Sequence, residues 1–105
     1  MNRMNCATRY EEFIQLGMSG KQEDVDRLMK ALIASDDLAT SKLVDFALGL
    51  IQNRDGFARL RYYLFQGTQM QRNYAALYFK RKGIDDLLDE AVILGKIDRE
   101  QAYSK

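Results

Sequence analysis

Residues 56–83 read GFARLRYYLFQGTQMQRNYAALYFKRKG, and this stretch predicts two helices that meet at Gly67. In the first helix, over residues 57–66, Phe57, Leu60 and Leu64 fall on one face at helical spacing. The second helix, over residues 69–82, is apolar around much of its circumference, which is typical of a helix packed between two neighbours. The stretch is therefore predicted to form the middle of a helical core.

The whole chain has the composition of an all-α protein. It has 105 residues, no proline and only 7 glycines. Good helix formers such as Ala, Leu, Gln, Lys and Glu dominate, whereas Val and Thr are scarce. A domain of this length buries roughly two-thirds of the surface of its unfolded chain, which is enough for a core without disulfides or metals. We therefore expect a single all-α domain over residues 1–105.

Apolar stripes outside the central stretch predict further helices. These begin near Thr8 and Ser19, cover about 38–52, and follow Gly83, with a short last turn after Asp98. The second has the clearest stripe, formed by Val25, Leu28, Met29, Leu32 and Ile33. The expected helix starts are capping boxes at Thr8 with Glu11, Ser19 with Gln22 and Thr68 with Gln71, an N-cap at Asp55 and a cap at Asp98 with Gln101. Gly49, inside the third helix, suggests close approach of a neighbouring backbone.

The six longer helices pair into three hairpins of similar length, at about 8–35, 38–66 and 68–94. Residues 72–98 read RNYAALYFKRKGIDDLLDEAVILGKID. This unit is similar to a short HEAT-like (armadillo-type) helical repeat of the bilin-lyase kind. The similarity lies mainly in residues 68–94, in the small pair Ala75 and Ala76, the glycine break at Gly83 and the stripe that includes Leu87 and Leu88. It implies three stacked antiparallel helical hairpins in a HEAT-like α-α superhelix; the alternative is a compact six-helix bundle.

Charge is unevenly distributed, although the formal net charge is only +1. Residues 54–82 carry seven Lys or Arg against Asp55 alone, whereas residues 1–53 and 83–105 carry net charges of −2 and −3. Internal pairing of the basic middle with the acidic ends is one interpretation. A site for a partner is the other.

The residue inventory argues against catalysis and against a cofactor. There is no histidine and the only cysteine is Cys6, so zinc sites, intramolecular disulfides and Cys–His nucleophile pairs are excluded. No nucleotide-binding or nucleophile-elbow motif occurs. The i, i+4 pairs Asp85/Asp89 and Asp86/Glu90 could share Mg²⁺, but acidic residues at a helix start on a solvated face are the favoured reading. We expect no enzyme, no cofactor and no metal site.

A polar strip on the two central helices is the predicted partner-binding site. It consists of Arg59, Gln66, Gln69, Arg72, Asn73 and Lys80. Arg and Tyr are enriched at protein interfaces, so the predicted function is a small protein-interaction or adaptor module whose partner presents an acidic surface or segment. The alternative is nucleic-acid binding by the same basic, tyrosine-flanked strip, and the strip could also be solvated surface only.

Arg61 is a separate case, because it falls inside the apolar arc between Phe57 and Phe65. If it is buried there, it needs a carboxylate partner, and Asp45 is the candidate.

The chain carries no sign of a membrane or secretory destination. Its longest apolar run, at about residues 46–51, is far shorter than a membrane span, and its start lacks the apolar segment of a signal peptide. A single cysteine fits a reducing compartment. We expect a cytoplasmic protein with no membrane partner, and a homo-oligomer could form through an uncapped end of the helical stack.

Overall fold

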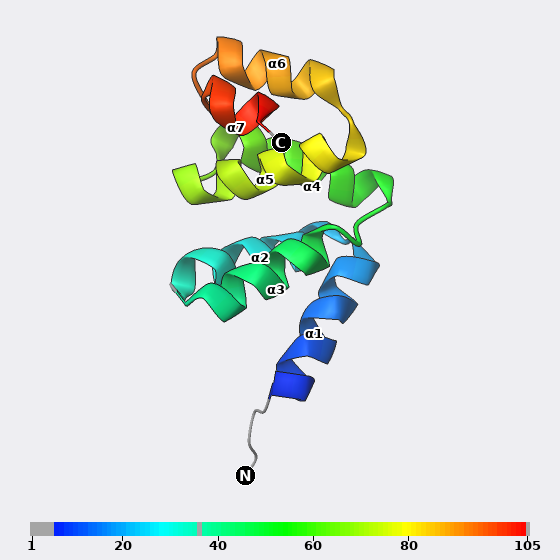
Figure 1. The fold of residues 1–105 in the computed structure, drawn as a ribbon. Helices are drawn as coiled ribbons and strands as arrows, with labels where there is room; N and C mark the ends of the chain where they lie inside the picture. Colours follow the sequence, from blue (N-terminus) through cyan, green and yellow to red (C-terminus); the bar gives the residue numbers. More distant parts are fainter. Residues whose placement is uncertain (1–5, 36, 105) are drawn as a thin grey trace. The chain divides into compact units, whose positions relative to one another are not determined.

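The computed structural model describes residues 6–35 and 37–104, which form helices joined by short connections (Figure 1). The helices are α1 (Cys6–Ser19), α2 (Gln22–Ala34), α3 (Leu38–Leu48), α4 (Arg54–Gln66), α5 (Gln69–Lys82), α6 (Asp85–Ile93) and α7 (Arg99–Tyr103). No strand occurs in the described ranges. The all-α prediction is confirmed, and the predicted bounds of α5 are those observed.

The contacts divide the chain into two compact units, Met1–Phe57 and Ala58–Lys105. In the first unit α1, α2 and α3 all pack against one another, and in the second unit α5, α6 and α7 do the same. Helix α4 begins in the first unit and continues into the second. The contacts of α1 with α2 and of α5 with α6 join the helices predicted to form the first and third hairpins.

The apolar stripe of α2 belongs to the core. Val25, Leu28, Met29 and Leu32 are fully buried, as predicted. Ile33 was expected among them but is 49% exposed. It lies at the edge of the apolar arc in the last turn of the helix, so burial of the other four side chains does not require burial of Ile33.

The close backbone approach in the first unit lies at Gly17 and not at Gly49. A β-carbon on Gly17 would lie 2.2 Å from the carbonyl oxygen of Ala47, so only glycine lets α1 and α3 meet here. Gly49 instead caps the end of α3, where its N–H donates to the carbonyls of Asp45 and Ala47. The predicted approach at Gly49 is therefore wrong, and α3 ends at Leu48 instead of continuing to about residue 52.

The predicted capping box at Thr68 and the predicted cap at Asp98 are both present. The Thr68 amide donates to Gln71 Oε1 at 2.9 Å and the Gln71 amide donates back to Thr68 Oγ1 at 3.2 Å. Asp98 and Gln101 make the same pair of bonds at the start of α7. Gly83 ends α5 in the left-handed region at φ +72°, as a C-terminal glycine is expected to do.

The other three predicted caps are wrong. Ser19 lies inside α1, where its hydroxyl donates to the Asp24 carboxylate, and Lys21 occupies the N-cap of α2. At α4 the side chain of Asn53, and not that of Asp55, accepts a bond at 3.3 Å from the Gly56 amide.

The start of α1 also differs from the predicted one. The helix begins at Cys6, so Thr8 lies within it and cannot be its N-cap. The side chains of Cys6 and Thr8 lie outside the described part of the structure. Within the described ranges, no helix has the length and apolar character needed to span a bilayer.

Candidate functional site

Arg72, one of the predicted partner-binding residues, is bound to backbone of its own unit. Its Nε donates to the Lys96 carbonyl at 2.7 Å and its Nη1 donates to the Gly67 carbonyl at 2.8 Å. Because the guanidinium is a rigid fork of donors, these two bonds fix the turn before α5 against the segment that follows α6. Arg72 therefore has a structural role that sequence reasoning did not assign to it.

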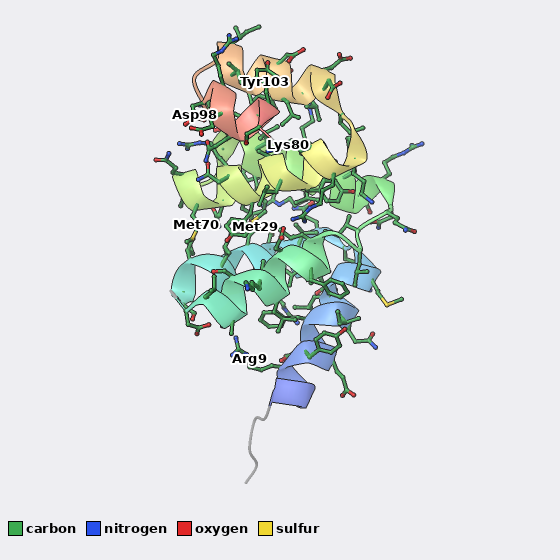
Figure 2. The ribbon with its side chains drawn as sticks, viewed as in Figure 1. Arg9, Met29, Met70, Lys80, Asp98 and Tyr103 are labelled. Atoms are coloured by element: carbon green, nitrogen blue, oxygen red, sulfur yellow. The ribbon has the colours of Figure 1, made fainter. Side chains whose placement is uncertain are left out.

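The other strip residues of α5 have different surroundings. Gln69 is exposed, whereas Asn73 is half-buried and its Oδ1 is buried without a hydrogen-bond donor in the described part of the chain. Lys80 lies towards α7 (Figure 2) and lines a hollow of about 400 Å³ that also involves Tyr103. The structure does not bring the α5 members of the strip together in one common hollow.

A second and larger hollow, of about 440 Å³, lies along the exposed face of α4 and the end of α6. We call it the α4 groove, and it is lined by Ala58, Arg61, Tyr62, Phe65, Gln66, Glu90, Leu94 and Lys96. Of the predicted strip only Gln66 lines it, and Arg59 contacts one of its walls. Tyr62 is 45% exposed and Leu94 is 55% exposed, so the groove presents apolar surface to solvent.

The groove follows from the two faces of α4. Leu60 and Leu64 are fully buried and hold one face of the helix in the core. Ala58, Tyr62 and Phe65 recur at helical spacing on the other face, and the small side chain of Ala58 leaves space beside the two rings.

Arg61 is exposed, contrary to the burial that its position suggested. Its guanidinium lies 5.9 Å from the centre of the Phe65 ring, which is itself only half-buried. The helical projection failed because it assumed that Phe65 points into the core. Since Arg61 is solvated, it does not need the buried carboxylate that Asp45 was expected to supply.

Arg59 is held above aromatic rings. Its guanidinium lies 4.2 Å from the ring centre of Tyr62 and 5.5 Å from that of Tyr63. The two rings meet edge to face, with centres 5.3 Å apart. Cation–π contacts of this kind restrict the arginine without removing its charge. Arg61 and Lys96 line the groove together with the carboxylate of Glu90, so the lining has a net positive charge.

The far wall of the groove is built by the end of α6. Gly95 adopts φ +74°, and the Lys96 amide then donates to the Ala91 carbonyl at 2.8 Å. Arg72 binds the Lys96 carbonyl from the other side. Gly95 was predicted to close this helix, but nothing in the local sequence indicated that Leu94 would be exposed beside α4.

One of the α6 carboxylates is bound by a side chain of α7. Asp89 accepts a hydrogen bond at 2.6 Å from the Tyr103 hydroxyl, and this bond raises the pKa of Tyr103 above its ordinary value. In the part of the chain that the structure describes, no group of three or more His, Cys, Asp or Glu side chains could hold a metal ion.

Comparison with models of protein families, with characterised proteins and with solved structures finds no match to this chain. A functional proposal therefore rests on the α4 groove and its charges.

Proposed function

We propose that this chain is a small protein-binding module, without catalytic activity, that docks an acidic surface or segment of a partner protein in the α4 groove. The observation that carries the proposal is the combination of exposed apolar walls with a cationic surround in one hollow of about 440 Å³. The lining includes Tyr62 and Arg61, and Tyr and Arg are among the residue types that most often dominate binding energy at interfaces.

The two kinds of side chain make different contributions. Covering the exposed parts of Tyr62 and Leu94 stabilises a complex by about 25 cal/mol per Å² of apolar surface. The excess positive charge accelerates association with an acidic partner and opposes a basic one. Arg59 is already restricted by its two tyrosines, so ordering it on binding costs less conformational entropy than ordering a free arginine.

Of the six predicted partner-binding residues, only the two on α4 remain in the proposed binding surface. Arg59 and Gln66 stay in the binding surface, and Arg61 and Lys96 join them. Arg72 is assigned a supporting role because two of its donors bind backbone carbonyls.

Nucleic-acid binding is the second candidate, and the half-exposed ring of Tyr62 beside Arg59 is the observation that favours it. A base would need the face of that ring for stacking. The Arg59 guanidinium already lies 4.2 Å from the ring centre, so a base would have to displace it. A protein segment can bind without disturbing this pair, and we therefore rank protein binding first.

The finer description of the fold belongs to the same proposal. The packing of α5 on α6, with Gly83 between them, is compatible with a short HEAT-like hairpin. Three stacked hairpins, a cytoplasmic location and self-association through an end of the stack remain predictions. A helical repeat would suit a module that binds partners rather than one that catalyses a reaction.

A photo-crosslinking experiment in the native cell tests the proposed site. A photoreactive phenylalanine derivative replaces Tyr62 in one variant and the exposed Ile33, in the other unit, in a control. We expect a discrete protein adduct from position 62 that is absent from position 33. A nuclease-sensitive adduct whose yield falls steeply with salt would instead support nucleic-acid binding.

Charge reversal then identifies the side chains involved. We expect Arg61→Glu combined with Lys96→Glu to remove the adduct from position 62. The matched control combines Lys30→Glu with Lys42→Glu, which reverses two exposed charges in the other unit and should preserve the adduct. Equal adduct yields from both double variants, with unchanged helicity by circular dichroism, would contradict the proposal.

A further inference from the structure

The size of the α4 groove limits what can occupy it. Small-molecule and side-chain pockets have volumes of about 300–1,000 Å³, and the groove, at about 440 Å³, is near the lower end. A stable interface between folded proteins typically buries about 800 Å² on each partner, which far exceeds the surface of eight lining residues in one hollow. The groove therefore fits one large side chain and its immediate neighbours.

The position of Ala58 indicates where this side chain would lie. Ala58 is exposed and sits one helical turn before Tyr62 and two turns before Phe65, so its small side chain leaves room on the same face of α4 as the two rings. Leu94 faces this stripe from the end of α6. An aromatic or large aliphatic side chain would contact apolar atoms on both walls.

The charges around this space select the neighbours of the anchoring side chain. Arg61 and Lys96 both line the groove, and Arg59 lies against Tyr62. Glu90 is the only lining carboxylate, so a basic segment would meet net repulsion and an acidic one net attraction. An arginine can also bind a carboxylate through two parallel hydrogen bonds.

From these observations we infer that the α4 groove recognises a short linear peptide in which one large apolar residue is flanked by Asp or Glu. The inference rests on the proposed function and specifies its partner as a peptide segment instead of a folded surface.

Fluorescence anisotropy with the full chain tests this inference. The probe is a fluorescein-labelled peptide with the core Asp-Glu-Phe-Glu-Asp between Gly-Ser ends. One comparison peptide carries Ser in place of Phe, and another carries Asn and Gln in place of the acids. We expect saturable binding of the first peptide and a loss of at least about tenfold in affinity for each comparison peptide, because each removes one of the two recognition elements.

Two protein variants connect the binding to the groove. Ala58→Trp places a large ring in this space from an exposed helical position and should reduce affinity by at least about tenfold, with helicity unchanged. Arg61→Glu should abolish the preference for the acidic peptide over its amide version. Lys30→Glu, an equal charge change in the other unit, should leave both affinities as they are.

Absence of saturable binding up to about 1 mM, or equal binding by Ala58→Trp, overturns the inference. The crosslinking at position 62 separates this failure from a failure of the proposed function. An adduct that depends on Arg61 and Lys96, found together with no peptide binding, would mean that the partner docks as a folded surface. That result would support the proposed protein-binding function and contradict the peptide inference.

Discussion

Gly17 allows the backbones of α1 and α3 to approach more closely than a β-carbon would permit. A β-carbon on residue 17 would lie only 2.2 Å from the carbonyl oxygen of Ala47, which is too close for two non-bonded atoms. This neighbour is backbone in the last turn of α3, so it cannot rotate out of the way as a flexible side chain could. The fit of α1 against α3 therefore depends on the absence of a single methyl group.

We expect Gly17→Ala to lower the free energy of unfolding by about 1–3 kcal/mol, in spite of the better helix propensity of alanine, because the helices must move apart. The measurement is the midpoint of urea-induced unfolding followed by circular dichroism. Gly49→Ala is the matched control. Gly49 has φ −64° and its nearest neighbour would lie 3.3 Å from the new β-carbon, so a much smaller change is expected. Equal effects of the two substitutions would show that α1 and α3 do not meet at Gly17.

At the scale of single elements, Asp37 fixes the start of α3. Its Oδ1 accepts the Thr40 amide at 2.6 Å and its Oδ2 accepts the Ser35 hydroxyl at 2.7 Å. These bonds favour the ionised carboxylate and lower the pKa of Asp37 from its ordinary 3.8 to about 2. The bond from the Thr40 amide makes the largest contribution. The cap thus depends on a charge that acid removes.

Because the pKa of Asp37 is lower in the folded state, its stabilising effect is present above pH 3.8 and is lost as the pH falls through about 2. We expect the urea midpoint to fall more between about pH 5 and about pH 2 for the native chain than for Asp37→Asn. Asparagine caps helices about as well as aspartate but does not titrate in this range. All other carboxylates titrate equally in both proteins, so an identical fall would show that Asp37 does not contribute in this way.

The sequence allowed helices to be predicted where the signals are local. The boxes at Thr68 and Asp98 each involve residues three apart, and both are observed. At Ser19 the local pattern was as good, but Ser19 is the last residue of α1 and its hydroxyl donates to Asp24. A pattern of four residues cannot decide whether its first residue caps the next helix or still belongs to the preceding one.

Features that depend on packing between helices were not accessible to the same reasoning. The role of Gly17 could not be predicted, because its contact, Ala47, is thirty positions away in the sequence. The α4 groove was found only in part for the same reason. The polar face of α4 correctly indicated Gln66 in the lining and Arg59 beside it. The exposed position of Leu94 depends on how α6 ends, and the burial of Phe65 was overestimated.

At the scale of the whole molecule, the question is whether the two units unfold together. The first unit, Met1–Phe57, contains 57 residues and the second, Ala58–Lys105, contains 48. Domains of about 60 residues bury only about 60% of the surface that the unfolded chain exposes, less than larger domains do, and are marginally stable alone. Helix α4 also passes through the boundary without interruption, so melting either half of it breaks hydrogen bonds that belong to both units.

We therefore expect one cooperative transition, as predicted for a single domain. Native-state hydrogen exchange on Gly17→Ala provides the measurement, because the substitution lies in the first unit and the α5 amides lie wholly in the second. In a single cooperative domain, the most protected amides of α5 lose the same opening free energy as those of α2, since both exchange only through global unfolding. If α2 loses protection while α5 keeps its native value, the units are separate domains, and the α4 groove, which lies wholly in residues 58–96, would then belong to the second domain alone.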